Sequence, residues 1–116
     1  MMVFHEISKL NRDGWNQHAY EAWVHAHGTP EQLAKQLASD PWRKLAPFRS
    51  YLSDLKGVRV ANLLGSHGKL AVSMALLGAE VTVVDISSDN AKYAKELAAA
   101  AGVHIEYLVM DVMEFP

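Results

Sequence analysis

The chain has 116 residues, half of them hydrophobic and 21% charged, which is the balance of one globular domain rather than of a disordered tail. Eleven basic residues against thirteen acidic ones give a formal charge of −2, without the cluster of Lys and Arg that a nucleic-acid backbone requires. The chain has no cysteine, no histidine pattern typical of a metal site and no apolar run of about 18 residues. Charges also interrupt the N-terminal segment, where a signal peptide is apolar. We therefore expect a cytoplasmic protein without nucleic-acid, membrane or metal partners.

The first half of the chain carries helical patterns. Apolar residues recur with helical period over residues 15–26, and Gly28 follows where a helix would end. Residues 29–32 (TPEQ) then combine an N-cap, a proline at the first helical position and a capping-box glutamine. This combination predicts a second helix, which buries Leu33 and Leu37.

Asp40-Pro41 repeats this starting signal and predicts a further helix that breaks near Pro47 and resumes before Gly57. The large aromatic residues of this half stand at helical spacings, which favours packing in the core. These residues are Trp15, Tyr20, Trp23 and Trp42. We interpret residues 1–57 as an N-terminal helical segment.

From residue 58 onward, short apolar runs alternate with helical patterns. Runs of β-branched and apolar residues predict three strands, the first of them buried on both faces. Between them, helical spacing and glycines at positions 78 and 102 predict two helices, the second capped by Ser87 or Ser88. The predicted strands cover residues 58–64, 80–86 and 103–110. The first predicted helix covers residues 70–77, and the second runs from its serine cap to Gly102.

Strands joined by single helices pair in parallel through right-handed crossovers, which predicts the strand order 3-2-1 with helices on the faces. This is half of a doubly wound, Rossmann-like α/β sheet. In such sheets ligands bind beyond the carboxyl ends of the strands, near the first strand. The residues that follow Leu64, Ile86 and Met110 are therefore the candidates for a site.

Three features stand at these positions. Residues 65–69 (GSHGK) form a small-residue turn before a helix, where backbone amides can approach a ligand; within it we expect His67 to be an exposed loop residue. Asp85 ends the second strand, 85 − 65 = 20 residues after Gly65, at the spacing of the carboxylate that accepts hydrogen bonds from ribose hydroxyls in nucleoside-binding sheets. Asp111 follows the third strand, where a carboxylate can accept a hydrogen bond from the amine of an adenine.

These features in this order resemble the cofactor half of the class I S-adenosylmethionine (SAM) dependent methyltransferases. The resemblance covers residues 58–116 and is strongest in VTVVDIS and YLVMDVMEFP. It implies that SAM is the cofactor, that the turn from Leu64 to Gly68 passes under its methionine part, that Asp85 holds the ribose and that Asp111 with Val112 recognises the adenine. The cofactor-binding residues implied are Asn62, Leu64, Gly65, Ser66, Gly68, Asp85, Ile86, Asp111 and Val112. Two features depart from the family pattern: Asn62 stands at a usually acidic position, and Leu64 and Ser66 replace two glycines.

The resemblance also implies that residues 58–116 are the first half of a SAM-binding domain and that residues 1–57 take the place of helices that close over the cofactor. The expected reaction is methyl transfer to a small-molecule acceptor. The family needs about seven strands, so we expect the chain to be truncated and inactive alone, with its catalytic residues unknown. The unpaired edge of the first strand predicts a homo-oligomer.

Two alternative functions remain open on the sequence. An NAD-dependent oxidoreductase is suggested by Gly65, Gly68 and Ala71, although Ser66 and Leu70 hold two of the glycine positions of a dinucleotide turn. A non-catalytic module that keeps the sheet for binding or assembly is favoured by Asn62 and Leu64.

Overall fold

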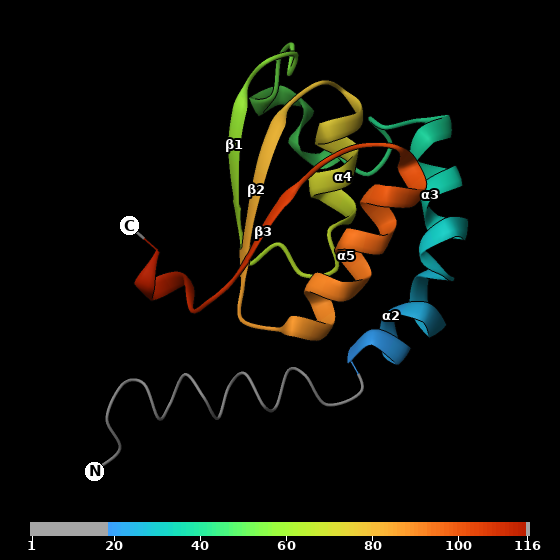
Figure 1. Cartoon of the computed structure of the whole chain (residues 1–116). Helices are drawn as coiled ribbons and strands as arrows, with labels where there is room; N and C mark the ends of the chain where they lie inside the picture. The colour runs from blue at the N-terminus through green and yellow to red at the C-terminus, as the bar shows by residue number, and fades with distance from the viewer. Residues whose placement is uncertain (1–18, 116) are drawn as a thin grey trace.

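The computed structural model describes residues 19–115, in which helices pack against one face of a parallel β-sheet (Figure 1). The sheet has three strands in the order β1-β2-β3, so the predicted order and parallel pairing are confirmed. Pairing places Asn62 opposite Val83 and Asp85 opposite Val109. The strands are β1 (Arg59–Leu63), β2 (Glu80–Asp85) and β3 (Glu106–Val109).

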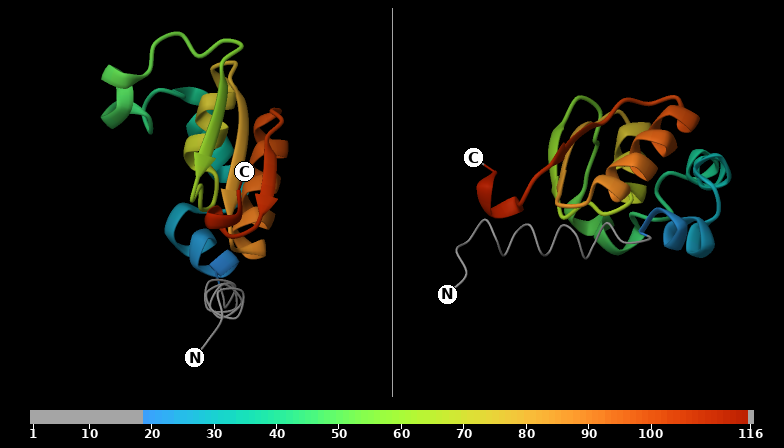
Figure 2. Two further views of the ribbon diagram at one scale, coloured as in Figure 1. Left: turned by 90° about the vertical axis from the view of Figure 1, so that its left-hand side faces the viewer. Right: turned by 60° about the horizontal axis from the view of Figure 1, so that its bottom comes forward.

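The described helices lie on the same side of this sheet or at its end. Helices α4 and α5 pack against the strands, α3 packs on α5, and α2 contacts α5 beside the carboxyl ends of the strands (Figure 2). The α-helices are α2 (Ala19–His27), α3 (Pro30–Ser39), α4 (Lys69–Leu76) and α5 (Ser88–Ala101), and two 3₁₀ helices are η1 (Ala46–Tyr51) and η2 (Val112–Glu114). The predicted first helix began at Trp15, and its start lies outside the described residues.

The local start and stop signals act as expected from the sequence. The Thr29 side chain accepts a hydrogen bond from the Gln32 amide while the Gln32 side chain accepts from the Thr29 amide, which completes the capping box of α3. Ser87 Oγ accepts from the Asn90 amide at the start of α5, and Gly102 ends α5 in the left-handed conformation. These signals set the first residues of α3 and α5 and the end of α5.

The helix predicted after Pro41 does not form. Residues 41–45 are turns and residues 46–51 form only η1. Pro47 has no amide hydrogen to donate and restricts the residue before it, so the segment stops at a short 3₁₀ turn. Only Leu45 and Leu55 of this stretch are buried, whereas Tyr51 is 85% exposed.

The prediction that the first strand is buried on both faces is also wrong. Residues along β1 alternate between exposed and half-buried, and the Leu63 side chain is 49% exposed. Two right-handed crossovers that advance in one direction place α4 and α5 on the same side of the sheet, so neither helix covers the opposite face of β1 (Figure 1). At the start of the strand, Arg59 and Glu80 form an exposed ion pair at 3.7 Å, a type that contributes little stability.

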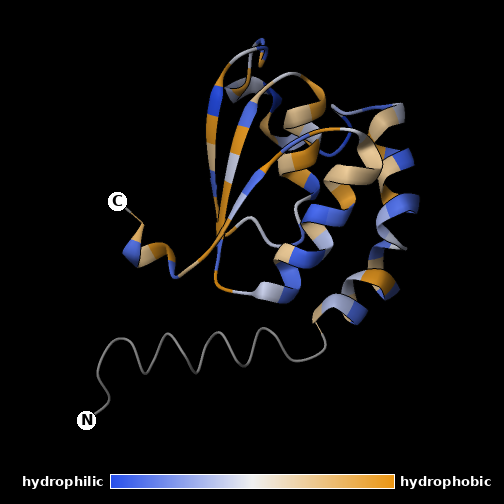
Figure 3. Ribbon diagram, in the orientation of Figure 1, coloured by the Kyte–Doolittle hydropathy of each residue, from blue (hydrophilic) through white to orange (hydrophobic). Residues whose placement is uncertain are grey.

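The core lies between the sheet and its helices, and the hydropathy colouring shows apolar residues along the strands (Figure 3). Its largest fully buried apolar side chains are Tyr93, Leu33, Leu37, Leu45, Leu97, Val72, Val83 and Val84. Tyr20, Trp23 and Trp42 pack on this core while partly exposed, in agreement with the expectation from their spacing. In residues 19–115 there is no helix of the length and hydropathy that crossing a bilayer would require.

Candidate functional site

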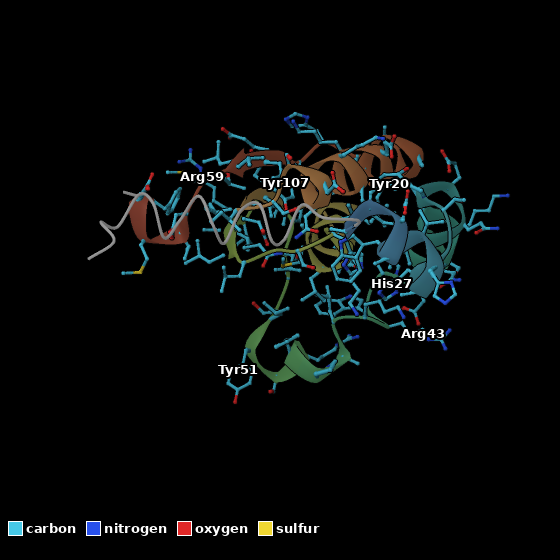
Figure 4. The ribbon with its side chains drawn as sticks, turned by 90° about the horizontal axis from the view of Figure 1, so that it is seen from below. Tyr20, His27, Arg43, Tyr51, Arg59 and Tyr107 are labelled. Atoms are coloured by element: carbon cyan, nitrogen blue, oxygen red, sulfur yellow. The ribbon has the colours of Figure 1, made fainter. Side chains whose placement is uncertain are left out.

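The loops that follow the three strands meet at the carboxyl edge of the sheet, which Figure 4 shows from below. The amide of Leu64 donates to the carbonyl of Val84 at 2.7 Å, so the loop after β1 is fixed to the end of β2. The amide of Met110 donates to the carbonyl of Asp85 at 2.9 Å and fixes the loop after β3 in the same way. Backbone hydrogen bonds therefore hold the three loops together.

Asp85 lies at the centre of this edge and is 8% exposed. Its Oδ2 atom accepts a hydrogen bond from the amide of Ser66 at 2.9 Å. Its Oδ1 atom accepts from the amide of Ser87 at 3.1 Å and from Nδ2 of Asn90 at 3.4 Å. The structure thus brings Asp85 to the loop after β1, as its spacing from Gly65 suggested.

The loop after β1 has an unusual backbone conformation. Leu64 and Ser66 have φ angles of 56° and 57°, in the left-handed region where glycine is favoured and where other residues pay about 1 kcal/mol or more. These are the two positions at which the resembled family carries glycines. Gly65 is required for space instead, because a Cβ there would lie 2.2 Å from Cγ1 of Val83. At Gly68 both reasons apply, since φ is 89° and a Cβ would lie 2.7 Å from Cβ of Ala94.

Tyr107 provides a further anchor for the loop that the sequence analysis missed. Its hydroxyl donates a 2.6 Å hydrogen bond to the carbonyl of Ser66, and the side chain is 8% exposed. Burial, and then the negative charge of Asp85, raise the pKa of Tyr107 above its usual value, so the hydroxyl stays protonated and donates. The sequence offered one signal: Tyr107 lies within the predicted third strand, at a position that faces the helices.

His67 is buried, which contradicts the prediction of an exposed loop residue. It is 4% exposed and its ring stacks on Trp23 and His27 at centroid distances of 4.3 and 4.4 Å. Burial lowers the pKa of His67 to about 3, helped by the neighbouring His27, Lys69 and Lys44. The pKa of His27 is also lowered, mainly by burial. Both rings are therefore neutral at pH 7.

A cavity of about 290 Å³ opens between α2 and the loop after β1. Trp23 and His27 line it on one side, and Asn62, Leu64 and His67 line it on the other. Among the described residues, Nδ2 of Asn62 and Nε2 of His67 are buried without a hydrogen-bond partner. Buried polar atoms of this kind are uncommon in native proteins, and their position on this cavity fits a polar ligand.

The remaining predicted residues lie at the same edge. Ile86 and Val112 are half-buried. Asp111 begins η2, and its Oδ1 atom accepts a 2.9 Å hydrogen bond from the amide of Met113. The carboxyl edge of the sheet therefore combines an apolar surface with two carboxylates, one after β2 and one after β3.

A larger cavity of about 710 Å³ lies elsewhere, on the uncovered face of the sheet, where Arg59 and Glu106 line it.

The described part of the chain is thus a partial Rossmann-like domain with a carboxylate-bearing site at the carboxyl edge of its sheet. Residues 64–116 match the family described as the methyltransferase domain. These similarities support a class I SAM-dependent methyltransferase, in agreement with the resemblance seen in the motifs of the chain.

Individual relatives agree with this class. The ubiquinone biosynthesis O-methyltransferase of Xanthomonas euvesicatoria pv. vesicatoria (strain 85-10) is 37% identical over 76 residues, which are 62% of this chain and 32% of that protein. The chain spans about a third of the length of the curated relatives it matches.

Solved structures share the fold. The magnesium protoporphyrin IX methyltransferase of Synechocystis PCC 6803, solved with bound SAH, superposes with a TM-score of 0.68 at 18% identity, over 94% of this chain and 53% of that one. The ribosomal protein L11 methylase of Lactobacillus delbrueckii subsp. bulgaricus has a TM-score of 0.51 at 28% identity, over 72% of this chain and 40% of that one.

Proposed function

We propose that the protein to which this chain belongs transfers a methyl group from SAM to a small-molecule acceptor. The observation that carries the proposal is the carboxylate of Asp85, buried at the carboxyl edge and hydrogen-bonded to the loop after β1. It stands in a segment that matches the methyltransferase domain.

In this proposal Asp85 binds the ribose. A carboxylate has about four acceptor positions on its two oxygens, and the amides of Ser66 and Ser87 with the side chain of Asn90 use three. The fourth, on Oδ2, is available to one ribose hydroxyl. The second hydroxyl would share Oδ2, so that Oδ1 keeps its contact with Asn90.

The loop after β1 and the nearby Asn62 would hold the methionine part. The unpartnered Nδ2 of Asn62 can donate to the carboxylate of the ligand, and Gly65, Ser66 and Gly68 let the ligand approach the backbone. Leu64 is 66% exposed and would contact the aliphatic chain of the methionine.

The adenine would lie between the ends of β2 and β3. Ile86 and Val112 are half-buried there and provide apolar contacts for the faces of the base. The carboxylate of Asp111, which accepts from the amide of Met113 through Oδ1, would also accept a hydrogen bond from the exocyclic amine. Asp111 thus has a capping role and a binding role.

When bound, SAM supplies a methyl group that its sulfonium already makes electrophilic. The contribution of this chain is to orient that group, because in-line positioning provides much of the acceleration in such a transfer.

The two parts of the chain have different roles in the proposal. Residues 58–116 would form the first half of the cofactor domain, and the segment before it, described from residue 19 onward, would close over it. Within that segment, α2 supports the assignment because Trp23 and His27 line the cavity beside the loop. The outer edge of β1 has no neighbouring strand among the described residues, which supports self-association through this edge.

Calorimetric titration of the chain with S-adenosylhomocysteine (SAH) tests the proposed function. We expect measurable binding, and an increase in Kd of about a hundredfold in Asp85→Asn, because two charge-assisted hydrogen bonds of about 1.5 kcal/mol each are lost. Asp54→Asn is a matched control, since Asp54 is exposed and accepts a hydrogen bond from the amide of Lys56, and its Kd should not change. Absence of heat at millimolar SAH with the folded chain would refute the proposal.

A further inference from the structure

A buried amide side chain links helix α2 to the carboxylate of Asp85. Asn90 lies in the first turn of α5 and is 3% exposed. Its Oδ1 atom accepts a 2.6 Å hydrogen bond from the indole Nε1 of Trp23, and its Nδ2 atom donates to Oδ1 of Asp85 at 3.4 Å. The amide oxygen of Asn90 is therefore bonded to α2, and its amino group is bonded to Asp85.

The chemistry of the indole fixes the orientation of this amide. An indole nitrogen is only a donor, so Trp23 must meet the oxygen of Asn90 and leave the amino group for Asp85. A shorter apolar side chain at position 90 would leave the indole and Oδ1 of Asp85 each without this partner.

Helix α2 reaches the site a second time through its rings. The ring of Trp23 stacks on His67, which follows Ser66 in the loop, and the amide of Ser66 donates to Asp85. Trp23, Asn90, Asp85, Ser66 and His67 thus form a closed circuit of contacts. A displacement of α2 changes the surroundings of the carboxylate from two directions.

We propose that Asn90 is a positioning residue for Asp85 and that it couples the docking of α2 to recognition of the ribose. The inference rests on the proposed function. Asn90 restricts rotation of the carboxylate, so that the remaining acceptor position on Oδ2 faces the ligand. Trp23 holds Asn90 in that orientation only while α2 is docked, and ribose binding therefore favours the docked helix.

The test compares two ligands that differ only in the ribose. SAH and its 2′,3′-dideoxy analogue are titrated calorimetrically into the wild-type chain, Asn90→Ala, Trp23→Phe and the double variant. Each single substitution should raise Kd for SAH about five- to tenfold, the effect of one hydrogen bond to a charged group. Kd for the analogue should not change, and the double variant should bind SAH no more weakly than Asn90→Ala.

Tyr93→Phe is the matched control. The hydroxyl of Tyr93 donates a 2.7 Å hydrogen bond to the carbonyl of Gly28 at the end of α2, so this substitution removes a bond between the same two parts of the chain without touching Asp85. Its Kd for SAH should stay within about twofold of the wild-type value, since less than 0.5 kcal/mol is involved.

Each possible result has a distinct meaning. Equal weakening for both ligands, or an unchanged Kd in Asn90→Ala, would overturn the positioning role while leaving the proposed function intact. Failure of the wild-type chain to bind SAH would overturn the proposed function and, with it, the ribose role of Asn90. The link itself is measured without ligand: the indole N–H resonance of Trp23 should shift in Asp85→Asn, and an unmoved resonance would refute it.

Discussion

The loop after β1 and helix α2 lie on opposite sides of the candidate cavity and are held in place by different forces. The loop is anchored through its backbone: the amide of Leu64 bonds to β2, and the amide and carbonyl of Ser66 bond to Asp85 and Tyr107. Such a loop can move only if the end of the sheet is disturbed.

Helix α2 has no buried residue. Its attachment includes ring contacts of Trp23 and His27 with His67, an edge contact of Tyr20 with Tyr93, and hydrogen bonds to α5. Side-chain contacts of this kind can break without opening the sheet. One wall of the cavity is therefore held by backbone hydrogen bonds to the sheet, and the other by side-chain contacts.

The largest expected effect is on the wall held by backbone hydrogen bonds. Gly65→Ala would place a Cβ 2.2 Å from Cγ1 of Val83 in the central strand, and we expect the free energy of unfolding to fall by about 3 kcal/mol, as for an overpacked core. Urea denaturation measures this change.

Gly57→Ala is the control for Gly65→Ala, because Gly57 has φ of 74° and no atom within 4 Å of an added Cβ. The free energy of unfolding of Gly57→Ala should fall by only about 1 kcal/mol, the cost of a side chain in the left-handed backbone conformation. Equal losses in the two variants would show that the loop is not packed as described.

The second prediction concerns pH and the wall held by side-chain contacts. The folded chain holds the pKa of His67 at about 3, below the value of about 6.5 in the unfolded chain, so the unfolded state binds the proton first as pH falls. The contribution of His67 to the free energy of unfolding is fully present above pH 6.5. It declines as the pH falls toward 3, by up to about 1.4 kcal/mol per pH unit. The free energy of unfolding should therefore be about 2 kcal/mol lower at pH 5 than at pH 7.

His67→Phe keeps a ring between Trp23 and His27 but has no proton site. Urea denaturation at several pH values should show a smaller loss of stability below pH 6.5 in this variant than in the wild-type chain. An identical pH dependence in both would mean that His67 is not buried in its neutral form.

The smallest expected effect is a gain in stability. Ser66 has φ of 57°, and Ser66→Gly removes the strain of a side chain in the left-handed region. We expect a net gain of up to about 1 kcal/mol, because the added flexibility of glycine in the unfolded chain offsets part of the relief. Thermal denaturation measures this gain, and a lower melting temperature would show that Ser66 contributes contacts worth more than the strain.

Much of the fold could be predicted from the sequence because its signals are local. The capping box of Thr29 and Gln32, the cap of Ser87 and the stop at Gly102 depend only on residues a few positions apart. Strand order followed from single-helix connections. The placement of Asp85 beside the loop followed from the topology, since parallel strands bring their carboxyl ends to one edge.

What could not be predicted depends on contacts between distant parts of the chain. His67 is buried because α2 covers it, and Asn90 matters because Trp23, 67 residues earlier, donates to it. Tyr107 reaches Ser66 across 41 residues. The exposure of β1 depended on which side the helices would occupy, and apolar content alone did not decide that.

The central claim is that an adenosyl ligand binds at the carboxyl edge of the sheet. Two-dimensional NMR of the isotope-labelled chain, titrated with SAH, tests it most directly. The account predicts that the amide resonances of Ser66, Ile86 and Val112 shift together with saturable dependence on SAH. Shifts confined to the uncovered sheet face around Arg59 and Glu106, where the larger cavity lies, would contradict it.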